Sequence, residues 1–231
     1  MDQFMEIKRE HPGTILFFRM GDFYELFHED AEIAAPVLGL ALTSRDKNAE
    51  NPIPMAGFPW HALEDNLRIM LKAGFKVTVA EQEQQLREGA KLLERVVTRI
   101  YTPGSLYEES LLSSNERSVL CSIVLGKSSL SMAVIDSSTG ESWASTWFDN
   151  ERFSSLQDEL LRWNPAEIVI SPKDAENDEL CTIFANLNDC VISQHSVNKK
   201  RRIERLEAIL QVSDLGHLDL DSSPLSIEAA G

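Results

Sequence analysis

The tripeptide Gly126-Lys127-Ser128 has the composition of the end of a phosphate-binding P-loop, in which backbone amides cradle a nucleotide phosphate. That loop requires a glycine five positions before Gly126, and the residue found there is Cys121. Without the first glycine the backbone cannot form the nest of amide donors, whereas a hairpin turn accounts for the tripeptide. We therefore expect no nucleotide hydrolysis from this chain.

Clustered carboxylates are the second chemistry to weigh, because several of them at one sheet edge could hold two metal ions for nucleic-acid cleavage. Residues 119–125 read as the first strand of such a sheet, and they contain no acidic side chain. Asp136 and Glu141 lie at the ends of neighbouring strand-like runs, where ordinary turn chemistry accounts for them. We expect no metal site and no enzyme activity, and a metal-dependent nuclease ranks last among the alternatives.

The charge balance limits how the chain could touch nucleic acid. Its 22 basic residues stand against 37 acidic ones, a net charge of −15, and neither half of the chain has a basic excess. Any contact with DNA must therefore rest on a local patch, on shape, or on a larger assembly that supplies the cations. The dense basic run of Lys199, Lys200, Arg201 and Arg202 is typical of a solvated helix face, with DNA phosphates or an acidic partner as the alternative.

The 231 residues favour two domains, and their hydrophobic periodicity indicates where the elements lie. Residues 1–112 read as a mixed α/β domain, with helices at 2–10, 29–38 and 63–71 and strands at 14–19, 75–79 and 96–101. A polar stretch at 107–118 reads as the linker. Residues 113–231 read as three strands (119–125, 129–136, 141–148), a helix (153–163), a strand (167–170), a helix (177–187) and a strand (190–193). That order is typical of a ribonuclease H-like sheet.

Targeting and redox signals point to the cytoplasm. No apolar run is long enough to span a membrane, and the amino terminus lacks a signal-peptide pattern. The three cysteines form no CxxC pair and are odd in number, which suits a reducing compartment. We therefore expect no membrane partner.

The most informative stretch is Phe23-Tyr24-Glu25, which follows an apolar run and a glycine-aspartate step. In an extended chain alternate side chains share a face, so Phe23 lies beside Glu25 while Tyr24 points the other way. Spacing alone leaves an ordinary alternative open, in which Phe23 is buried in a sheet and Glu25 lies at its rim.

Three motifs carry a resemblance that bears on this choice. Residues 18–27 (FRMGDFYELF), 52–61 (PIPMAGFPWH) and 102–104 (TPG) closely resemble, in the same order, the amino-terminal domain of the MutS mismatch-repair proteins. The resemblance covers residues 1–112 tightly, while 113–231 match the connector domain of that family in length and texture. It implies a mismatch-recognition domain, a ribonuclease H-like connector, and an amino-terminal fragment of a longer protein.

The same resemblance assigns roles to residues. Phe23 would enter the minor groove and stack on a mispaired base while the duplex kinks, which costs least where pairing is already defective. Glu25 would hydrogen-bond the displaced base, and its repulsion by phosphates would penalise intact duplex. The candidate mismatch-binding residues are Phe23, Tyr24, Glu25, Met20 and Met55, and the weaker candidates for phosphate contacts are Arg45, Arg95 and Arg99.

The family also implies partners that the residues themselves do not. These are mismatched duplex DNA, a second copy of the full-length protein, and a MutL-type repair partner that binds the connector. We expect no cofactor in residues 1–231, with ATP and magnesium in a carboxy-terminal domain, and a location in the bacterial cytosol near the nucleoid. The alternative is an acidic protein-interaction scaffold without DNA contact of its own.

Overall fold

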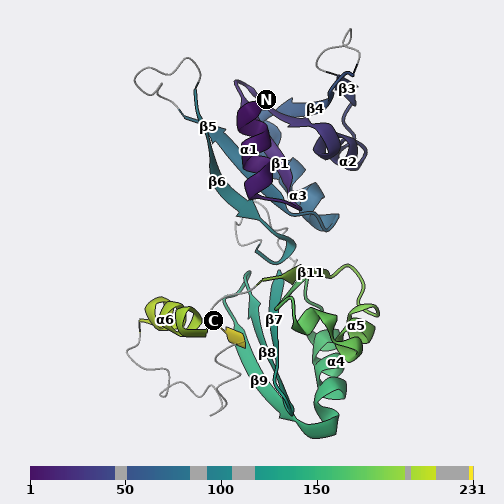
Figure 1. The fold of residues 1–231 in the computed structure, drawn as a ribbon, viewed down its shortest axis with the longest axis vertical. Helices are drawn as coiled ribbons and strands as arrows, with labels where there is room; N and C mark the ends of the chain where they lie inside the picture. Colours follow the sequence, from purple (N-terminus) through teal and green to yellow (C-terminus); the bar gives the residue numbers. More distant parts are fainter. Residues whose placement is uncertain (45–50, 84–92, 106–117, 196–198, 212–228, 231) are drawn as a thin grey trace. The chain divides into compact units, whose positions relative to one another are not determined.

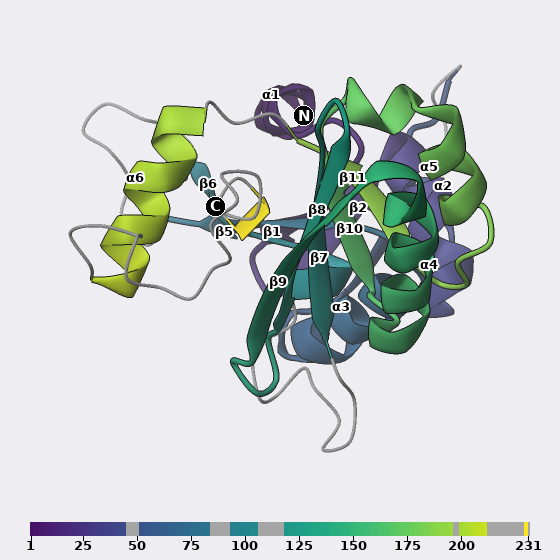
Figure 2. The ribbon, with the colours of Figure 1, turned by 90° about the horizontal axis from the view of Figure 1, so that it is seen from below.

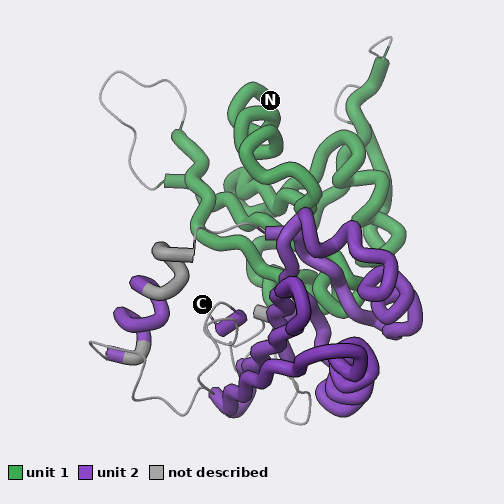
Figure 3. Tube along the Cα trace, turned by 60° about the horizontal axis from the view of Figure 1, so that its bottom comes forward, with its two compact units in different colours: residues 1–103, 108–113 green, residues 104–107, 114–231 purple. Residues whose placement is uncertain are grey.

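The computed structural model describes residues 1–44, 51–83, 93–105, 118–195, 199–211 and 229–230. They form two compact units, and in the described chain the first unit ends at Pro103 and the second begins at Gly104 (Figure 3). The predicted domain boundary between residues 112 and 113 lies outside the described residues. None of the helices in the described ranges has both the length and the apolar character needed to cross a membrane.

Unit 1 is built on a six-stranded mixed sheet with the order β3-β4-β2-β1-β5-β6 (Figure 1). Its elements are α1 (Asp2–Glu10), β1 (Ile15–Met20), β2 (Phe23–Phe27), α2 (His28–Leu38), β3 (Thr43–Ser44), β4 (Pro54–Pro59), η1 (Trp60–Ala62), α3 (Leu63–Lys72), β5 (Val77–Gln82) and β6 (Arg95–Tyr101). The short helix η2 (Pro103–Ser105) follows, with Pro103 in unit 1 and Gly104 in unit 2. Strands β1 and β5 run parallel, and the other neighbours are antiparallel. The predicted mixed α/β class is confirmed.

Aromatic side chains fill both faces of this sheet, and α1 and α3 lie on opposite sides of it (Figure 2). On the α1 side, the ring of Phe4 meets Phe18 and Phe27 at centroid distances of 5.7 and 5.2 Å. On the other side, Phe58 meets Phe17 at 4.9 Å and Tyr24 at 5.6 Å. Because β1 and β2 contribute rings to both faces, the hairpin that they form is fixed by packing from above and below.

Local signals explain how α3 ends and why β5 begins later than expected. Gly74 has a φ of +82°, and the amide of Phe75 donates to the carbonyl of Met70 at 3.0 Å. This is the hydrogen-bond pattern of a Schellman cap, so Phe75 belongs to the helix end rather than to the strand. The predicted strand at 75–79 is therefore displaced to Val77–Gln82.

Unit 2 contains a five-stranded sheet with the order β9-β8-β7-β10-β11. Its elements are β7 (Val119–Leu125), β8 (Ser129–Asp136), β9 (Ser142–Phe148), η3 (Asp149–Glu151), α4 (Arg152–Trp163), β10 (Glu167–Ile170), η4 (Asp174–Glu176), α5 (Asp178–Phe184), β11 (Val191–Gln194) and α6 (Lys199–Leu210). Three antiparallel strands are followed by two that run parallel to β7. This topology confirms the ribonuclease H-like prediction.

The core of unit 2 lies between the sheet and helices α4 and α5, which cover one of its faces (Figures 1 and 2). Leu156 and Leu160 of α4 and Leu180 of α5 are fully buried against Cys121 and Ile168. Helix α5 is shorter than the predicted 177–187, and Asn177 caps it by accepting a hydrogen bond from the amide of Leu180 at 3.0 Å.

Candidate nucleic-acid interface

A two-residue turn, Gly21-Asp22, joins β1 to β2 and presents Phe23 at the start of β2. Gly21 has a φ of +60°, a conformation that glycine adopts without a steric penalty. The side chain of Phe23 is 48% exposed, whereas that of the next residue, Tyr24, is 1% exposed. The alternative that buries Phe23 in the sheet is therefore wrong.

Strand register places Phe23 and Glu25 on one face of the sheet. Met20 pairs with Phe23, and Glu25 pairs with Phe18 on one side and Gly57 on the other. A Cβ atom at Gly57 would lie 2.9 Å from the carbonyl oxygen of Tyr24 and 3.7 Å from Cγ of Glu25. The missing side chain of Gly57 thus lets β4 approach β2 closely and leaves room for the half-buried Glu25.

Tyr24 was expected among the mismatch-binding residues, and its position corrects that expectation. Its ring packs on Phe17 and Phe58, and its hydroxyl donates to a carboxylate oxygen of Glu81. Burial, helped by that carboxylate, raises the pKa of Tyr24 well above its usual value. Tyr24 therefore supports the turn from the opposite face instead of presenting its side chain to a ligand.

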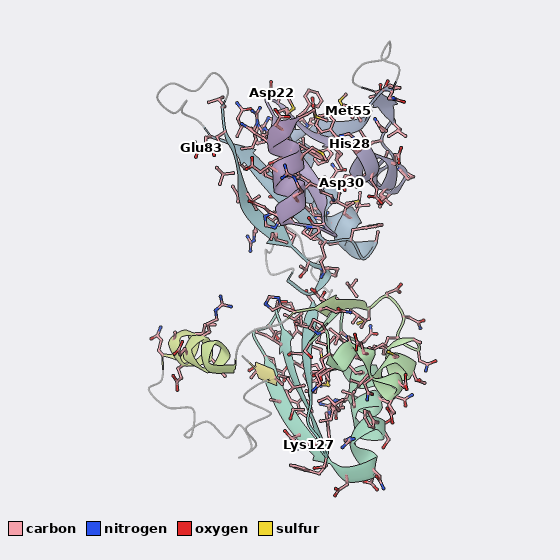
Figure 4. The ribbon with its side chains drawn as sticks, viewed as in Figure 1. Asp22, His28, Asp30, Met55, Glu83 and Lys127 are labelled. Atoms are coloured by element: carbon pink, nitrogen blue, oxygen red, sulfur yellow. The ribbon has the colours of Figure 1, made fainter. Side chains whose placement is uncertain are left out.

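Met20 and Met55 lie on the face that carries Phe23. Register gives this result directly, because Met20 pairs with Phe23 and Met55 pairs with Phe27. Both side chains are half-buried and pack against the cluster that includes Phe4. In Figure 4, Met55 and Asp22, the second turn residue, lie toward the same end of unit 1. A contact of either methionine with DNA stays a prediction.

The three arginines proposed for phosphate contacts differ in what the structure says of them. Arg95 donates to the carbonyls of Arg19 at 3.2 Å and Leu93 at 2.7 Å, so its guanidinium holds the protein chain together. Arg99 lies over the ring of Tyr101, 5.0 Å from its centroid. Arg45 lies outside the described residues. Arg95 thus has a structural role, and a phosphate contact of any of the three arginines stays a prediction.

Arg19 and Trp60 lie beside the turn on the opposite face, the one that carries Tyr24, and no role was predicted for them. Trp60 follows β4 and is 51% exposed. The guanidinium of Arg19 lies between two rings, 5.2 Å from the centroid of Trp60 and 5.4 Å from that of Tyr24. The one available signal was the place of Trp60 within the motif at 52–61. The side chain of Arg19 thereby links the exposed ring of Trp60 to the buried ring of Tyr24.

In unit 2 the motifs that could have carried catalysis are turns. The amide of Gly126 donates to the carbonyl of Ser129 at 2.9 Å, so Gly126-Lys127-Ser128 is the predicted hairpin turn, with Lys127 at its tip (Figure 4). Asp136 accepts from the amide of Ser138 at 3.0 Å, as expected for turn chemistry. Within the described ranges, no three His, Cys, Asp or Glu side chains gather in a way that could hold a metal ion.

The basic run at 199–202 lies in helix α6, as its helical reading predicts. The side chains of residues 199–203 are outside the described part of the chain, so their contacts stay a prediction.

Comparison with known proteins gives two family matches, one to each half of the chain. Residues 1–110 match the model of MutS domain I, and residues 118–231 match that of MutS domain II. DNA mismatch repair proteins MutS from Caldanaerobacter subterraneus subsp. tengcongensis and Syntrophomonas wolfei are 33% and 36% identical over the whole chain, which covers 26% and 27% of their lengths. The protein of the same name from Rickettsia canadensis is 39% identical over 88% of the chain and 24% of its own length. The chain thus spans about a quarter of the length of these curated relatives.

Proposed function

The chain belongs to the MutS family of DNA mismatch repair proteins, and on that premise we propose that unit 1 recognises mispaired or unpaired bases by inserting Phe23 into the minor groove. The observation that carries this proposal is the exposure of Phe23 at a tight turn, in a strand whose next residue is fully buried. An aromatic ring held clear of the core can enter a base stack without unfolding the sheet behind it.

The insertion selects mismatches through the cost of deforming DNA. Wedging a ring between base steps costs a few kcal/mol of unstacking, and this cost is lowest where pairing is already defective. The ring recovers part of the cost by stacking on a base, which contributes about 1–3 kcal/mol. Insertion of the ring into an intact duplex therefore costs more free energy, so binding favours mispaired sites.

Glu25 adds a second selection on the same face. A carboxylate near the backbone phosphates is repelled by them, and a hydrogen bond to an available base edge offsets that repulsion. In a mispaired site the displaced base offers its Watson–Crick edge, whereas in an intact duplex those edges are already paired. We assign to Glu25 the rejection of normal duplex, which is consistent with the net acidity of the chain.

The test is the substitution Phe23→Ala in the complete natural protein that contains these residues. Affinities for a duplex with one unpaired thymine and for its perfect match are measured at one stated salt concentration. The ratio of the two affinities should fall by about 5- to 150-fold, the equivalent of losing one stacked base. An unchanged ratio contradicts the proposal.

Phe148 offers a matched control in unit 2, since it is a phenylalanine at a strand end with 59% of its surface exposed. Phe148→Ala removes the same number of atoms and should leave the ratio unchanged. If both variants bind DNA like the wild type while binding to a protein partner persists without residues 1–112, the acidic scaffold becomes the better account.

The remaining assignments rest on family membership. We infer that unit 2 is a connector that relays the DNA-bound state to a MutL-type partner and that the full-length protein acts as a homodimer. We assign no cofactor to residues 1–231, and ATP with magnesium to a domain beyond them. Copurification of the partner with unit 2 variants and the mass of the full-length protein in solution test these assignments.

A further inference from the structure

The turn that presents Phe23 is held by hydrogen bonds more than by packing. A Cβ atom built on Gly21 would meet no atom within 4 Å. An open cavity of about 450 Å³ lies beside the turn, with Arg19, Trp60 and Gln82 in its lining. Dispersion forces require neighbouring atoms, so the geometry of this turn depends on its polar contacts.

Three backbone groups of the turn are bonded to side chains or backbone of three different elements. The amide of Gly21 donates to Oε1 of Gln82, on β5, at 3.2 Å. The carbonyl of Asp22 accepts from the amide of Trp60, at the start of η1, at 2.9 Å. The carbonyl of Gly21 accepts from Nε of Arg19, on β1. Hydrogen bonds to three different elements thus fix the backbone that leads into Phe23.

Gln82 is the member of this set that reaches furthest along the chain, 61 residues from Gly21. The same Oε1 accepts from Nη2 of Arg95 at 3.3 Å, and Gln82 and Arg95 are paired across β5 and β6. Arg95 also donates to the carbonyl of Arg19 and lies 5.5 Å from the centroid of Phe18. Through Gln82 the turn is coupled to a side chain that is itself fixed at three points.

We propose that Gln82 is a positioning residue for Phe23, whose amide oxygen fixes the Gly21-Asp22 turn and so the direction in which the ring leaves the surface. This inference rests on the proposed insertion of Phe23. A ring that is already aimed loses less conformational freedom on binding, and the saving strengthens the complex only with DNA that accepts the ring. Gln82 therefore acts on discrimination without touching DNA.

Positioning and stability can be separated at this site. The hydrogen bond from Gly21 to Gln82 is exposed to solvent, and Arg95 keeps its bonds to the carbonyls of Arg19 and Leu93 when Gln82 is replaced. Water can replace an exposed partner at little cost, so its loss should barely change the stability of unit 1. A residue that merely held the fold together would show the opposite pattern, with lower stability and equal weakening on every DNA.

The experiment compares Gln82→Leu with Gln82→Glu in the complete natural protein. The probe is a duplex with one unpaired thymine beside a 2-aminopurine, whose fluorescence rises when the base unstacks, and the reference is the perfect match. Gln82→Leu should lower the affinity ratio about fivefold, the cost of ordering roughly one backbone residue on binding, and should weaken the fluorescence rise with Tm nearly unchanged. Gln82→Glu keeps an acceptor oxygen and should restore both.

Two further variants make every outcome informative. Gln157→Leu, on an exposed position of α4, controls for the change in side-chain chemistry and should behave as the wild type. Phe23→Ala, measured alongside, separates this inference from the function on which it rests. If Phe23→Ala lowers the ratio and Gln82→Leu does not, positioning by Gln82 is overturned while insertion stands. If neither lowers it, both proposals fail, and a lower Tm with equal loss on both duplexes also overturns positioning.

Discussion

Phe23 in unit 1 and Phe148 in unit 2 are both phenylalanines at strand ends, and they expose 48% and 59% of their surfaces. Phe23 starts β2 after a turn that is tied by Gln82 and Trp60, with Glu25 next to it on the same face. Phe148 ends β9, at the edge of its sheet, and pairs with Ser129 on β8. Phe23 is the less exposed of the two rings, and the turn before it is held by hydrogen bonds from distant parts of the chain.

The difference shows that solvent exposure alone does not distinguish an aromatic ring that binds a ligand from one that has no function. Single exposed apolar residues are common on protein surfaces and need no function. What sets Phe23 apart is convergence: residues from β1, β5 and η1 are bonded to two adjacent backbone positions. We regard this convergence of hydrogen bonds as the feature that distinguishes a binding site from an isolated exposed ring.

The largest expected effect concerns the independence of the two cores. Phe17 in unit 1 and Leu156 in unit 2 are both fully buried. Phe17→Ala should lower the free energy of unfolding of unit 1 by about 3–5 kcal/mol, and Leu156→Ala that of unit 2 by about 2–5 kcal/mol, because each leaves a cavity. Hydrogen exchange read by mass spectrometry should show lost protection in the substituted unit alone. Loss in both units together would contradict the division.

The next effect tests the division into two units at two tightly packed glycines, one in each unit. A Cβ atom at Gly104 would lie 2.8 Å from Cδ1 of Leu120 and 2.9 Å from Cβ of Glu167, both in unit 2. At Gly57 it would lie 2.9 Å from a backbone oxygen in unit 1. Gly104→Ala should destabilise unit 2 and Gly57→Ala unit 1, each by about 1–3 kcal/mol. Equal midpoints of urea unfolding for Gly104→Ala and the wild type would contradict the prediction for Gly104.

Much of unit 2 could be predicted from sequence because its elements follow local rules. Strands β7, β8 and β10 begin and end at the predicted residues, since apolar runs there are bounded by clear turns. In unit 1, β4 was not predicted, because Pro54, Gly57 and Pro59 are poor strand residues. It forms through pairing with β2 and β3, and Gly57 is needed for that close approach.

The candidate site divides in the same way. Alternation placed Phe23 and Glu25 on one face and Tyr24 on the other, but it could not say which face was buried. The role of Arg95 was missed because its contact with Arg19 spans 76 residues, a pairing that no local pattern contains. The contacts that fix the turn are tertiary, and they appear only when β5 is placed beside β1.

A third prediction separates Glu25 from the general acidity around the turn. Asp22 is exposed at the turn itself, and its backbone, not its side chain, makes the bond to Trp60. Glu25→Ala should strengthen binding to the perfect duplex by about two- to fivefold, the worth of one surface charge interaction, and so lower discrimination. Asp22→Ala should strengthen binding to both duplexes equally. If Glu25→Ala leaves perfect-duplex affinity unchanged, the repulsion argument is wrong.

The smallest expected effect concerns Asp30, the buried carboxylate of unit 1 whose counterpart in unit 2 is Glu167. Asp30 in unit 1 forms an ion pair with Lys8 and accepts from the amide of Leu16 at 3.0 Å. In unit 2, Glu167 accepts from the amide of Gly104 at 3.2 Å and from the hydroxyl of Ser193. Burial raises the pKa of Asp30 above its ordinary value, although Lys8 and Leu16 oppose the shift. The folded chain therefore holds the Asp30 proton to a higher pH than the unfolded chain does.

The sign of the pH dependence follows from that shift. A carboxyl whose folded pKa is raised contributes stability that is fully present below its unfolded pKa, about 3.9, and is lost as pH rises through the folded pKa. The advantage of wild type over Asp30→Asn in urea unfolding should therefore be largest near the acid end of the range and shrink toward neutrality. An advantage that grows with pH would mean that the attraction of Lys8 outweighs the cost of burial, which would make Asp30 a net electrostatic anchor for α2 rather than a carboxylate tolerated for its hydrogen bond to β1.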